Sequence, residues 1–229
     1  MDKGRTRNKQ PADLKRCAEF HGHVCPGLIY GYRVAKEAAR LMKLKRSKDE
    51  EVVTISENDS CAVDALQVLL GTSAGKGNLI IQDFGKNAYT VLNRSTRRAY
   101  RFSRKSLYEY GGKNKKLFSR LEKAVAAKAA TAEDRQKLKS MKMEDLLTRP
   151  FGEIFTTAEV PFVEPYYARL EQSLPCAVCG EMTMATKLSP LAGKGYVCIP
   201  CSQNNDNKNH TAARRTAARK HIGKNYGRD

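Results

Sequence analysis

Two pairs of cysteines near the C-terminal end constrain the fold of this chain more than any other feature. Cys176 and Cys179 are separated by two residues, as are Cys198 and Cys201, and 18 residues lie between the pairs. A tetrahedral zinc ion binds four thiolates at about 2.3 Å, and a C-x2-C turn presents two sulfurs to one ion. Gly180 follows the first pair and permits a tight turn there. The pattern predicts a closed, structural zinc site in a small domain.

The same four cysteines allow other interpretations. They could form two redox dithiols, or hold an iron–sulfur cluster or a single iron ion. We favour a treble-clef or ribbon-type zinc finger whose second pair enters a C-terminal helix. Such fingers bind nucleic acid in some proteins and only stabilise a fold in others. The basic segment directly after Cys201 favours the first role.

The number and spacing of the cysteines indicate a reducing compartment. The chain has seven cysteines, an odd number, and C-x2-C pairs in the cytosol are typical of metal or redox chemistry. The polar N-terminus lacks the apolar core of a signal peptide. No apolar run reaches the length of about 18 residues that a membrane span needs. We therefore expect a cytoplasmic protein without a membrane span.

The net charge of +18 is concentrated in two segments. Residues 94–149 contain 17 Lys or Arg and 6 Asp or Glu, and the chain after Cys201 contains 7 and 2. Such a field attracts nucleic acid, another polyanion or an acidic partner. The alternative is a solvated surface that is merely basic, because charge alone specifies no partner.

Hydrophobic periodicity predicts an α+β core, with helices packed on one face of a largely antiparallel sheet. Asp13 is expected to cap the first helix, and Asp59 or Ser60 the third. The expected elements are helices over 13–20, 26–44 and 60–70, strands over 51–56 and 79–85, a hairpin over 87–103 and a last strand after residue 150.

Two further helices, rich in Ala, Lys and Leu, are expected over 114–129 and 132–147. Thr131 and Asp134 resemble a capping box at the start of the second one. We expect the chain to divide into a metal-binding core, the four-cysteine finger, and a basic tail that is either disordered or a frayed helix, over 1–174, 175–203 and 204–229 respectively.

The stretch "EFHGHVCPG" carries a second candidate metal site. His21 and His23 flank one glycine, and in an extended segment residues two apart, including Cys25, project to the same side. Pro26 suits the first turn of a helix, so Cys25 stands where unpaired N–H groups favour a thiolate. Imidazole and thiolate together suit zinc, iron, nickel or copper better than magnesium or calcium.

A second cluster lies in "SENDSCAVDALQ". On a helix, Cys61 and Asp64 are one turn apart and share a face with Gln67 or Val68. Asp64 could ligate a metal, orient a histidine or act as a base. A lone histidine or buried cysteine is commonly structural, but the occurrence of both clusters favours a site. The nearby Gly/Lys loops do not match a phosphate-binding P-loop.

Two long motifs, "FHGHVCPGLIYGYRVAKEA" and "DSCAVDALQVLLGTSAGKGNLIIQDFGKNAYTVL", resemble the FmdE family of formylmethanofuran dehydrogenase components. The resemblance covers most of residues 14–165, and the finger is similar to one that many members carry. It implies an α+β core that forms a homodimer around a metal-binding pocket. Carried over by position, the candidate site residues are His21, His23, Cys25, Cys61, Asp64, Gln67 and Lys86.

The resemblance implies a role accessory to a molybdenum or tungsten enzyme, with the redox chemistry on other polypeptides. We expect zinc, or iron or nickel, held by His21, His23 and Cys61. Cys25 would be a ligand or a reactive thiol. Thr72 and Ser73 stand where some members have a cysteine, so we expect no ligand from that loop.

The remaining candidates have auxiliary roles in this hypothesis. Asp64 would support a histidine or act as a base, Lys86 would neutralise an anionic substrate or cofactor, and Gln67 would contact a cofactor. Both a catalytic and a purely binding role are compatible with these residues. The alternative hypothesis is a zinc-finger module that binds nucleic acid or a protein partner, with the core as a dimerisation scaffold.

Overall fold

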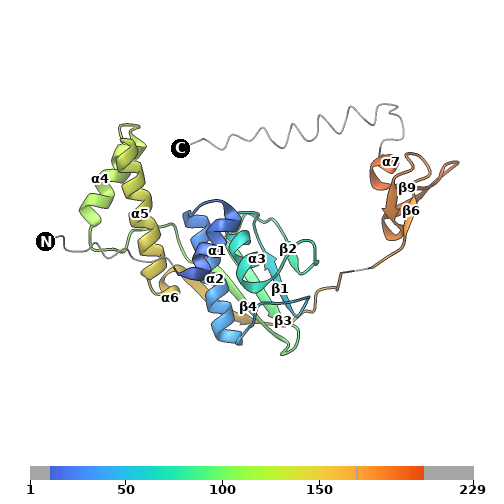
Figure 1. Ribbon diagram of the computed structural model, residues 1–229, viewed down its shortest axis with the longest axis horizontal. Helices are drawn as coiled ribbons and strands as arrows, with labels where there is room; N and C mark the ends of the chain where they lie inside the picture. The colour runs from blue at the N-terminus through green and yellow to red at the C-terminus, as the bar shows by residue number, and fades with distance from the viewer. Residues whose placement is uncertain (1–10, 169, 204–229) are drawn as a thin grey trace. The chain divides into compact units, whose positions relative to one another are not determined.

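A computed structural model describes residues 11–168 and 170–203 of the 229-residue chain (Figure 1). Its internal contacts divide the chain into two compact units, Met1–Ala168 and Arg169–Asp229. The division falls a few residues before the boundary that we expected at residue 174. The predicted basic tail over 204–229 lies outside the described residues.

The first unit is built on a five-stranded sheet in the order β2-β1-β3-β4-β5. β2 runs parallel to β1, and the other neighbours are antiparallel. β3 and β4 form the expected hairpin. The strands are β1 (Val52–Ser56), β2 (Leu79–Ile81), β3 (Ala88–Asn93), β4 (Arg98–Arg104) and β5 (Phe155–Val160).

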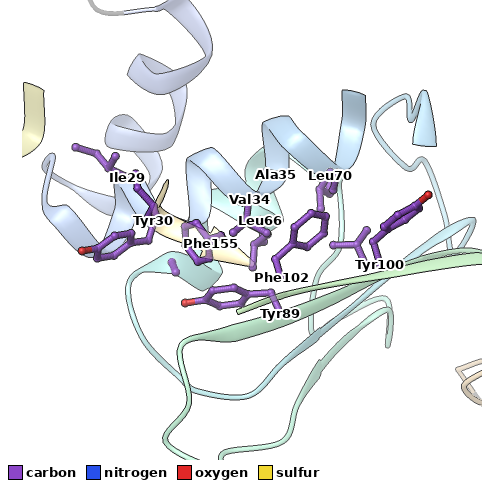
Figure 2. Packing of buried hydrophobic residues seen from close by; sticks show 14 of the residues in the cluster. Ile29, Tyr30, Val34, Ala35, Leu66, Leu70, Tyr89, Tyr100, Phe102 and Phe155 are labelled. Carbon is purple, nitrogen blue, oxygen red and sulfur yellow. The ribbon is translucent and has the colours of Figure 1, made fainter. Parts of the chain in front are cut away.

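Two helices, α2 (Pro26–Met42) and α3 (Ala62–Leu70), cover one face of this sheet, and α1 (Ala12–His21) packs on these two helices. Apolar residues recur at helical spacing along α2 and face alternate residues of β3 and β4. Figure 2 shows this interface, with aromatic side chains of the strands beneath aliphatic side chains of the helices. The fully buried members include Ile29, Val34, Leu66, Tyr89, Phe102 and Phe155.

Two glycines let α2 and α3 approach each other closely. A Cβ atom at Gly31 would overlap the backbone carbonyl of Ala62, and one at Gly27 would lie 3.0 Å from the Cβ of Cys61. Any larger residue at position 31 would push the first turn of α3 away from α2. These glycines therefore bring the two candidate motifs, one at the start of each helix, side by side.

Two of the expected helix caps are wrong. Asn58 accepts hydrogen bonds from the backbone N–H and the hydroxyl of Ser60, so neither Asp59 nor Ser60 caps α3. Asp13 lies inside the first turn of α1, where it accepts from Tyr32 at 3.0 Å instead of capping the helix. In both places a nearby polar partner competes with the helix end.

β2 is shorter than the strand expected over 79–85. The chain leaves the sheet after Ile81 and turns back toward Glu57, whose carbonyl accepts from the backbone N–H groups of Phe84 and Lys86. The residues after β2 therefore hold the loop that connects β1 to α3.

A helical hairpin, α4 (Lys115–Ala126) and α5 (Ala132–Thr148), separates β4 from the short α6 (Phe151–Ile154) and β5. The predicted capping box at Thr131 and Asp134 is confirmed. The hairpin has a small core of its own, with Phe118, Leu121 and Met141 buried. Arg33 of α2 donates to the Leu146 and Arg149 carbonyls at the end of α5, which ties the hairpin to the helical layer.

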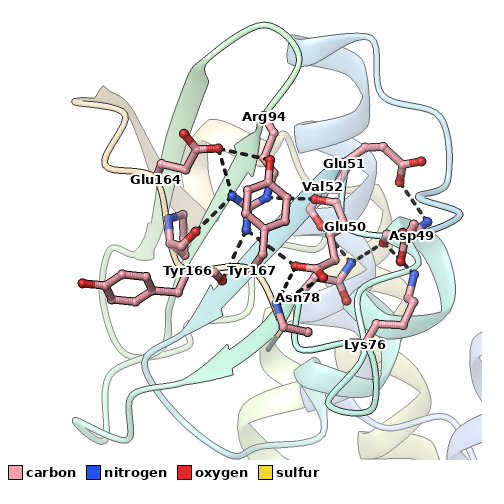
Figure 3. Close-up of polar contacts among 12 residues, drawn as sticks. Asp49, Glu50, Glu51, Val52, Lys76, Asn78, Arg94, Glu164, Tyr166 and Tyr167 are labelled. Atoms are coloured by element: carbon pink, nitrogen blue, oxygen red, sulfur yellow. Dashed lines mark hydrogen bonds and ion pairs between the residues drawn. The ribbon is translucent and has the colours of Figure 1, made fainter. Parts of the chain in front are cut away.

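The segment after β5 is fixed on the first unit by Arg94 (Figure 3). The Arg94 guanidinium donates to Glu164 at 3.0 Å and to the Pro165 carbonyl, and it stacks 3.7 Å from the centre of the Tyr167 ring. Its side chain is only 6% exposed. These contacts explain why the first unit extends to Ala168.

The second unit contains two small hairpins and a helix. The first hairpin pairs β6 (Ser173–Pro175) with β7 (Met182–Met184), and the second pairs β8 (Leu188–Leu191) with β9 (Gly195–Cys198). A 3-10 turn, Ala185–Lys187, joins the hairpins, and α7 (Ile199–Gln203) follows β9. Cys201 lies in α7, so the second cysteine pair enters a helix as expected.

The α+β fold class is confirmed, with its helices on a mostly antiparallel sheet and a separate four-cysteine unit. Among the described residues, no helix has the length and apolar character that crossing a membrane requires.

Candidate metal centres

The turn between α1 and α2 brings three metal-ligand side chains together. His21 is the last residue of α1, and Gly22 follows in the left-handed conformation with φ of 91°, which ends the helix. The ligand atoms of His21, His23 and Cys25 all lie within 4.8 Å of one another. His23 is exposed, so this group opens toward solvent.

Asp64 of α3 orients His21 from the side opposite the thiol. Nδ1 of His21 lies 2.7 Å from Oδ2 of Asp64, while Nε2 lies 3.7 Å from Sγ of Cys25. A proton on Nδ1 that is donated to the carboxylate leaves the Nε2 lone pair free for a metal. Gln67 donates to the other Asp64 oxygen at 3.2 Å and so fixes the carboxylate.

Cys25 stands at the N-terminal cap of α2. Its sulfur accepts the backbone N–H of Leu28 at 3.3 Å, and Pro26 occupies the first helical position. The local sequence therefore fixes this sulfur at the start of α2, close to the two histidines.

Cys61 supplies a second thiol beside Cys25. A Cβ atom built on Gly27 would lie 3.6 Å from the Cys61 sulfur and 3.8 Å from the Cys25 sulfur. Burial raises the pKa of the Cys61 thiol, and the neighbouring Cys25 and Asp64 raise it further. Cys61 is therefore a protonated thiol at neutral pH unless a cation lies beside it.

The structure brings most of the predicted core residues together, in a slightly different arrangement. We expected His21, His23 and Cys61 as first ligands, whereas the group of close ligand atoms contains Cys25 in place of Cys61. Gln67, expected at a cofactor, contacts Asp64.

Lys86 is exposed, and its carbonyl accepts from the Asn58 side chain at 2.6 Å. Thr72, in the loop where we expected no ligand, is buried and donates to Thr54.

A buried polar cluster beside the site was missed in the sequence. Glu57 is 8% exposed and forms a two-pronged ion pair with Arg101, at 2.6 and 2.9 Å. The hydrogen bond from Arg101 lowers the pKa of Glu57, and the nearby Arg101 and Lys86 charges add to this effect. Asn58 donates to the Lys86 carbonyl and to the Tyr89 hydroxyl. Only the run "SEN" directly after a β-branched strand hinted at this cluster.

The donor set fits a transition metal. Tetrahedral bonds of about 2.0 Å to nitrogen and 2.3 Å to sulfur place the two ligand atoms about 3.5 Å apart. The separation of 3.7 Å between His21 Nε2 and Cys25 Sγ is close to that value. Three protein ligands leave a fourth position free, which is the arrangement of reactive rather than structural zinc sites.

The four cysteines of the second unit form the other group of close ligand atoms, again within 4.8 Å of one another. Sγ of Cys179 lies 3.9 Å from Sγ of Cys198, near the roughly 3.8 Å expected between two zinc-bound sulfurs. The Cys198 N–H donates to the Cys176 sulfur at 3.3 Å, and Gly180 has a positive φ of 73°.

The ionisation of these four cysteines depends on whether a cation lies among them. Hydrogen bonds from the backbone N–H groups of Cys179 and Cys198 lower the pKa of Cys176 to about 6. Burial and the neighbouring sulfurs raise the pKa of Cys201 to about 12. Four crowded sulfurs cannot all ionise without a positive ion among them. Three of these cysteines, Cys176, Cys198 and Cys201, form the finger's small core with Val197, Leu188 and Leu191, so metal binding would supply much of its stability.

Together, these features define an α+β protein with a mixed His/Cys cluster in its core and a four-cysteine group in a second unit. A family model described as "FmdE, Molybdenum formylmethanofuran dehydrogenase operon" matches residues 20–156, which is more than half of the chain. The chain belongs to the FmdE family. Both metal-ligand motifs of the core, at 21–25 and 61–64, lie inside the matched range.

Two similar proteins are informative. A "Probable S-adenosyl-L-methionine-binding protein" of Archaeoglobus fulgidus is 29% identical over 204 residues, which cover 82% of this chain and 52% of the relative. The chain thus spans about half the length of that relative. A crystal structure of an FmdE-like protein of tungsten formylmethanofuran dehydrogenase, from Syntrophus aciditrophicus, matches with a TM-score of 0.52 and 19% identity, covering 85% of this chain and 92% of the other. This match supports the fold.

Proposed function

We propose that the core unit binds one transition-metal ion between His21, His23 and Cys25. The convergence of their three ligand atoms, with Asp64 fixing His21, carries this proposal. Zinc is the proposed resting metal, with iron or nickel as alternatives. A bound ion would supply a Lewis acid with a free coordination position.

The neighbouring residues have distinct roles in this proposal. Asp64 holds the proton on His21 Nδ1, and Gln67 positions Asp64. Cys61 provides a further thiol, either as an additional ligand or as a reactive group beside Cys25. Lys86 would offer positive charge to an anionic substrate at the rim of the site.

Metal analysis of the purified full-length chain tests the site. Wild-type protein should retain two metal ions per chain, one for each group of ligands. Cys25→Ala should lose one ion while its far-UV circular dichroism is unchanged. Cys17→Ala is a matched control, because Cys17 is a fully buried thiol of α1, outside both groups, whose pKa burial raises to about 11. Equal metal content in wild type and Cys25→Ala would refute the core site.

We further propose that the chain is accessory to a molybdenum or tungsten enzyme of the formylmethanofuran dehydrogenase type, as a homodimer in the cytoplasm. The family description supports the accessory role, whereas the homodimer and the cytoplasmic location are carried over from the sequence. The expected result for tagged protein purified from its own cells is co-elution with molybdenum or tungsten, and a mass of two chains when isolated. A lone monomer without either metal would contradict it.

S-Adenosylmethionine is a second compound to test, because the Archaeoglobus relative is named for binding it. Calorimetric titration of the metal-loaded chain with S-adenosylmethionine should show whether this chain, which matches about half of the relative, binds the compound. Heat of binding that disappears in Cys25→Ala would place the compound at the core site, and the same heat in that variant would place it elsewhere.

We propose a structural role for zinc in the four-cysteine unit. Four thiolates close the coordination shell, so this ion would stabilise the two hairpins and would not take part in a reaction.

A further inference from the structure

The α4–α5 hairpin carries a concentration of basic residues that the metal sites do not explain. Residues 113–142 contain ten Lys or Arg and three Asp or Glu. One of the acids, Asp134, is engaged in the capping box with Thr131. The segment 113–142 therefore carries a net charge of +7.

The basic side chains of the hairpin differ from those of the sheet in having no close carboxylate partner among the residues that the structure describes. On the sheet, Arg94, Arg98 and Arg101 each form an ion pair with a glutamate. Among the described residues, none of the basic side chains between 113 and 142 forms an ion pair within 4.0 Å. Lys142 lies over the Tyr108 ring, but exposed charges without a close counter-ion raise the local potential and favour an external polyanion.

Helical periodicity collects three of these charges on one face of α4. Phe118 and Leu121 are buried against α5. Lys116, Arg120 and Lys123 project from the opposite face and are exposed. Seven residues of helix span about 10 Å, so this basic stripe is continuous over two turns. Its neighbours on that face, Ser119 and Ala127, are small and leave the approach open.

The hairpin presents this stripe on a rigid support. The ring of Tyr110 stacks on Phe118, with 4.3 Å between centroids and planes within 4° of parallel. Tyr108 donates to Asp145 of α5 at 2.6 Å. A preorganised basic face loses little conformational entropy when it binds.

We propose that this stripe, Lys116, Arg120 and Lys123, binds the phosphate backbone of a double-stranded nucleic acid. A protein partner would need apolar or aromatic anchors, but of the large apolar side chains in the described hairpin only Val125 is more than about one-third exposed, at 37%. Single strands are held by stacking on exposed aromatic rings, and Phe118, the aromatic residue of α4, is buried. A surface with exposed basic side chains and few exposed apolar or aromatic ones is suited to contacts with the phosphate backbone of a duplex.

Salt-dependent binding of labelled duplex DNA and duplex RNA to the full-length chain tests the proposal. The triple variant Lys116→Glu, Arg120→Glu, Lys123→Glu should weaken binding by roughly tenfold or more at low salt. The slope of log K against log salt should become shallower by about 2.7, because each lost phosphate contact removes about 0.9. Binding of DNA, RNA or both in this manner supports the proposal, since both present the same backbone.

The matched control is Lys43→Glu, Lys45→Glu, Lys48→Glu, which changes the net charge equally on another exposed segment of the same unit. The control variant should bind the duplex with an affinity within about twofold of the wild-type value. Equal weakening by both triple variants, or stronger binding of a single strand than of a duplex, would overturn the proposal. If the Glu variant unfolds, the corresponding Gln variant keeps the test intact, and affinity equal to wild type would overturn it.

Discussion

At the scale of single residues, the core site depends on how its ligands are held as much as on which ligands are present. His21 is fixed by a hydrogen bond to Asp64, and Cys25 by the amide of Leu28 at a helix start. Sequence spacing predicted the ligand types within "HGHVC", because those residues are neighbours in the chain. The bond from Asp64 to His21 joins residues 43 positions apart, so spacing alone could not specify it.

Replacing Asp64 by Asn should weaken metal binding without removing a ligand. The amide keeps the size of the carboxylate but no longer favours a proton on His21 Nδ1, so affinity should fall by roughly 10- to 100-fold. Competition with a chromogenic chelator measures the change. Asp49→Asn, an exposed aspartate outside both ligand groups, should bind metal like wild type, and an unchanged affinity in Asp64→Asn would show that the bond has no role.

Glu57→Gln should destabilise the first unit in a pH-dependent way. Arg101 lowers the pKa of Glu57 in the folded state, so the ion pair stabilises the fold above the unfolded pKa of about 4.3. This contribution is lost as the pH falls through the lower, folded pKa. With Arg101 about one-third exposed, we expect a loss of about 1–2 kcal/mol at pH 7. Urea titrations should show the difference from wild type shrinking below pH 4, and a constant difference would contradict the assignment.

At the scale of elements, the site depends on the contact between α2 and α3. Sequence periodicity predicted both helices, but their close approach becomes visible only when the atoms that face Gly31 are known. The caps show a similar limit. Thr131 and Asp134 were recognised because they form a local box, whereas Asn58 displaced the expected cap through contacts with the distant Lys86 and Tyr89.

Gly31→Ala should disrupt the contact between α2 and α3. The added methyl group would overlap the Ala62 carbonyl, so the helices must separate, at a cost of about 1–3 kcal/mol or more. Metal affinity at the core should fall as well, since Asp64 moves with α3. Gly152→Ala has nothing within 4 Å of the added atom and serves as the control. Equal thermal stability of the two variants would contradict this packing argument.

At the scale of the whole molecule, the two units should respond differently to metal removal. The first unit has a large apolar core on its five-stranded sheet, whereas the described core of the second consists of three cysteines and three aliphatic side chains. The spacing of the cysteines predicted the second unit directly. Its division from the first after Ala168 depends on Arg94, which holds residues 164–167 and carried no sequence signal.

Chelation should therefore unfold the second unit and leave the first one folded. Limited proteolysis after treatment with a strong chelator should release a fragment that ends near residue 168, with the helical circular dichroism largely retained. Cys179→Ala should behave in the same way without a chelator. Resistance of the finger to proteolysis in the metal-free chain would contradict a structural metal.

Anomalous diffraction at the zinc absorption edge, from crystals of the full chain grown with zinc, tests the central claim most directly. The account predicts two peaks per chain. One should lie among the four cysteines, and the other should be bonded to His21, His23 and Cys25, with Asp64 on the far side of the His21 ring. A single peak at the four cysteines, with no peak beside His21 and Cys25, would contradict the proposed core site.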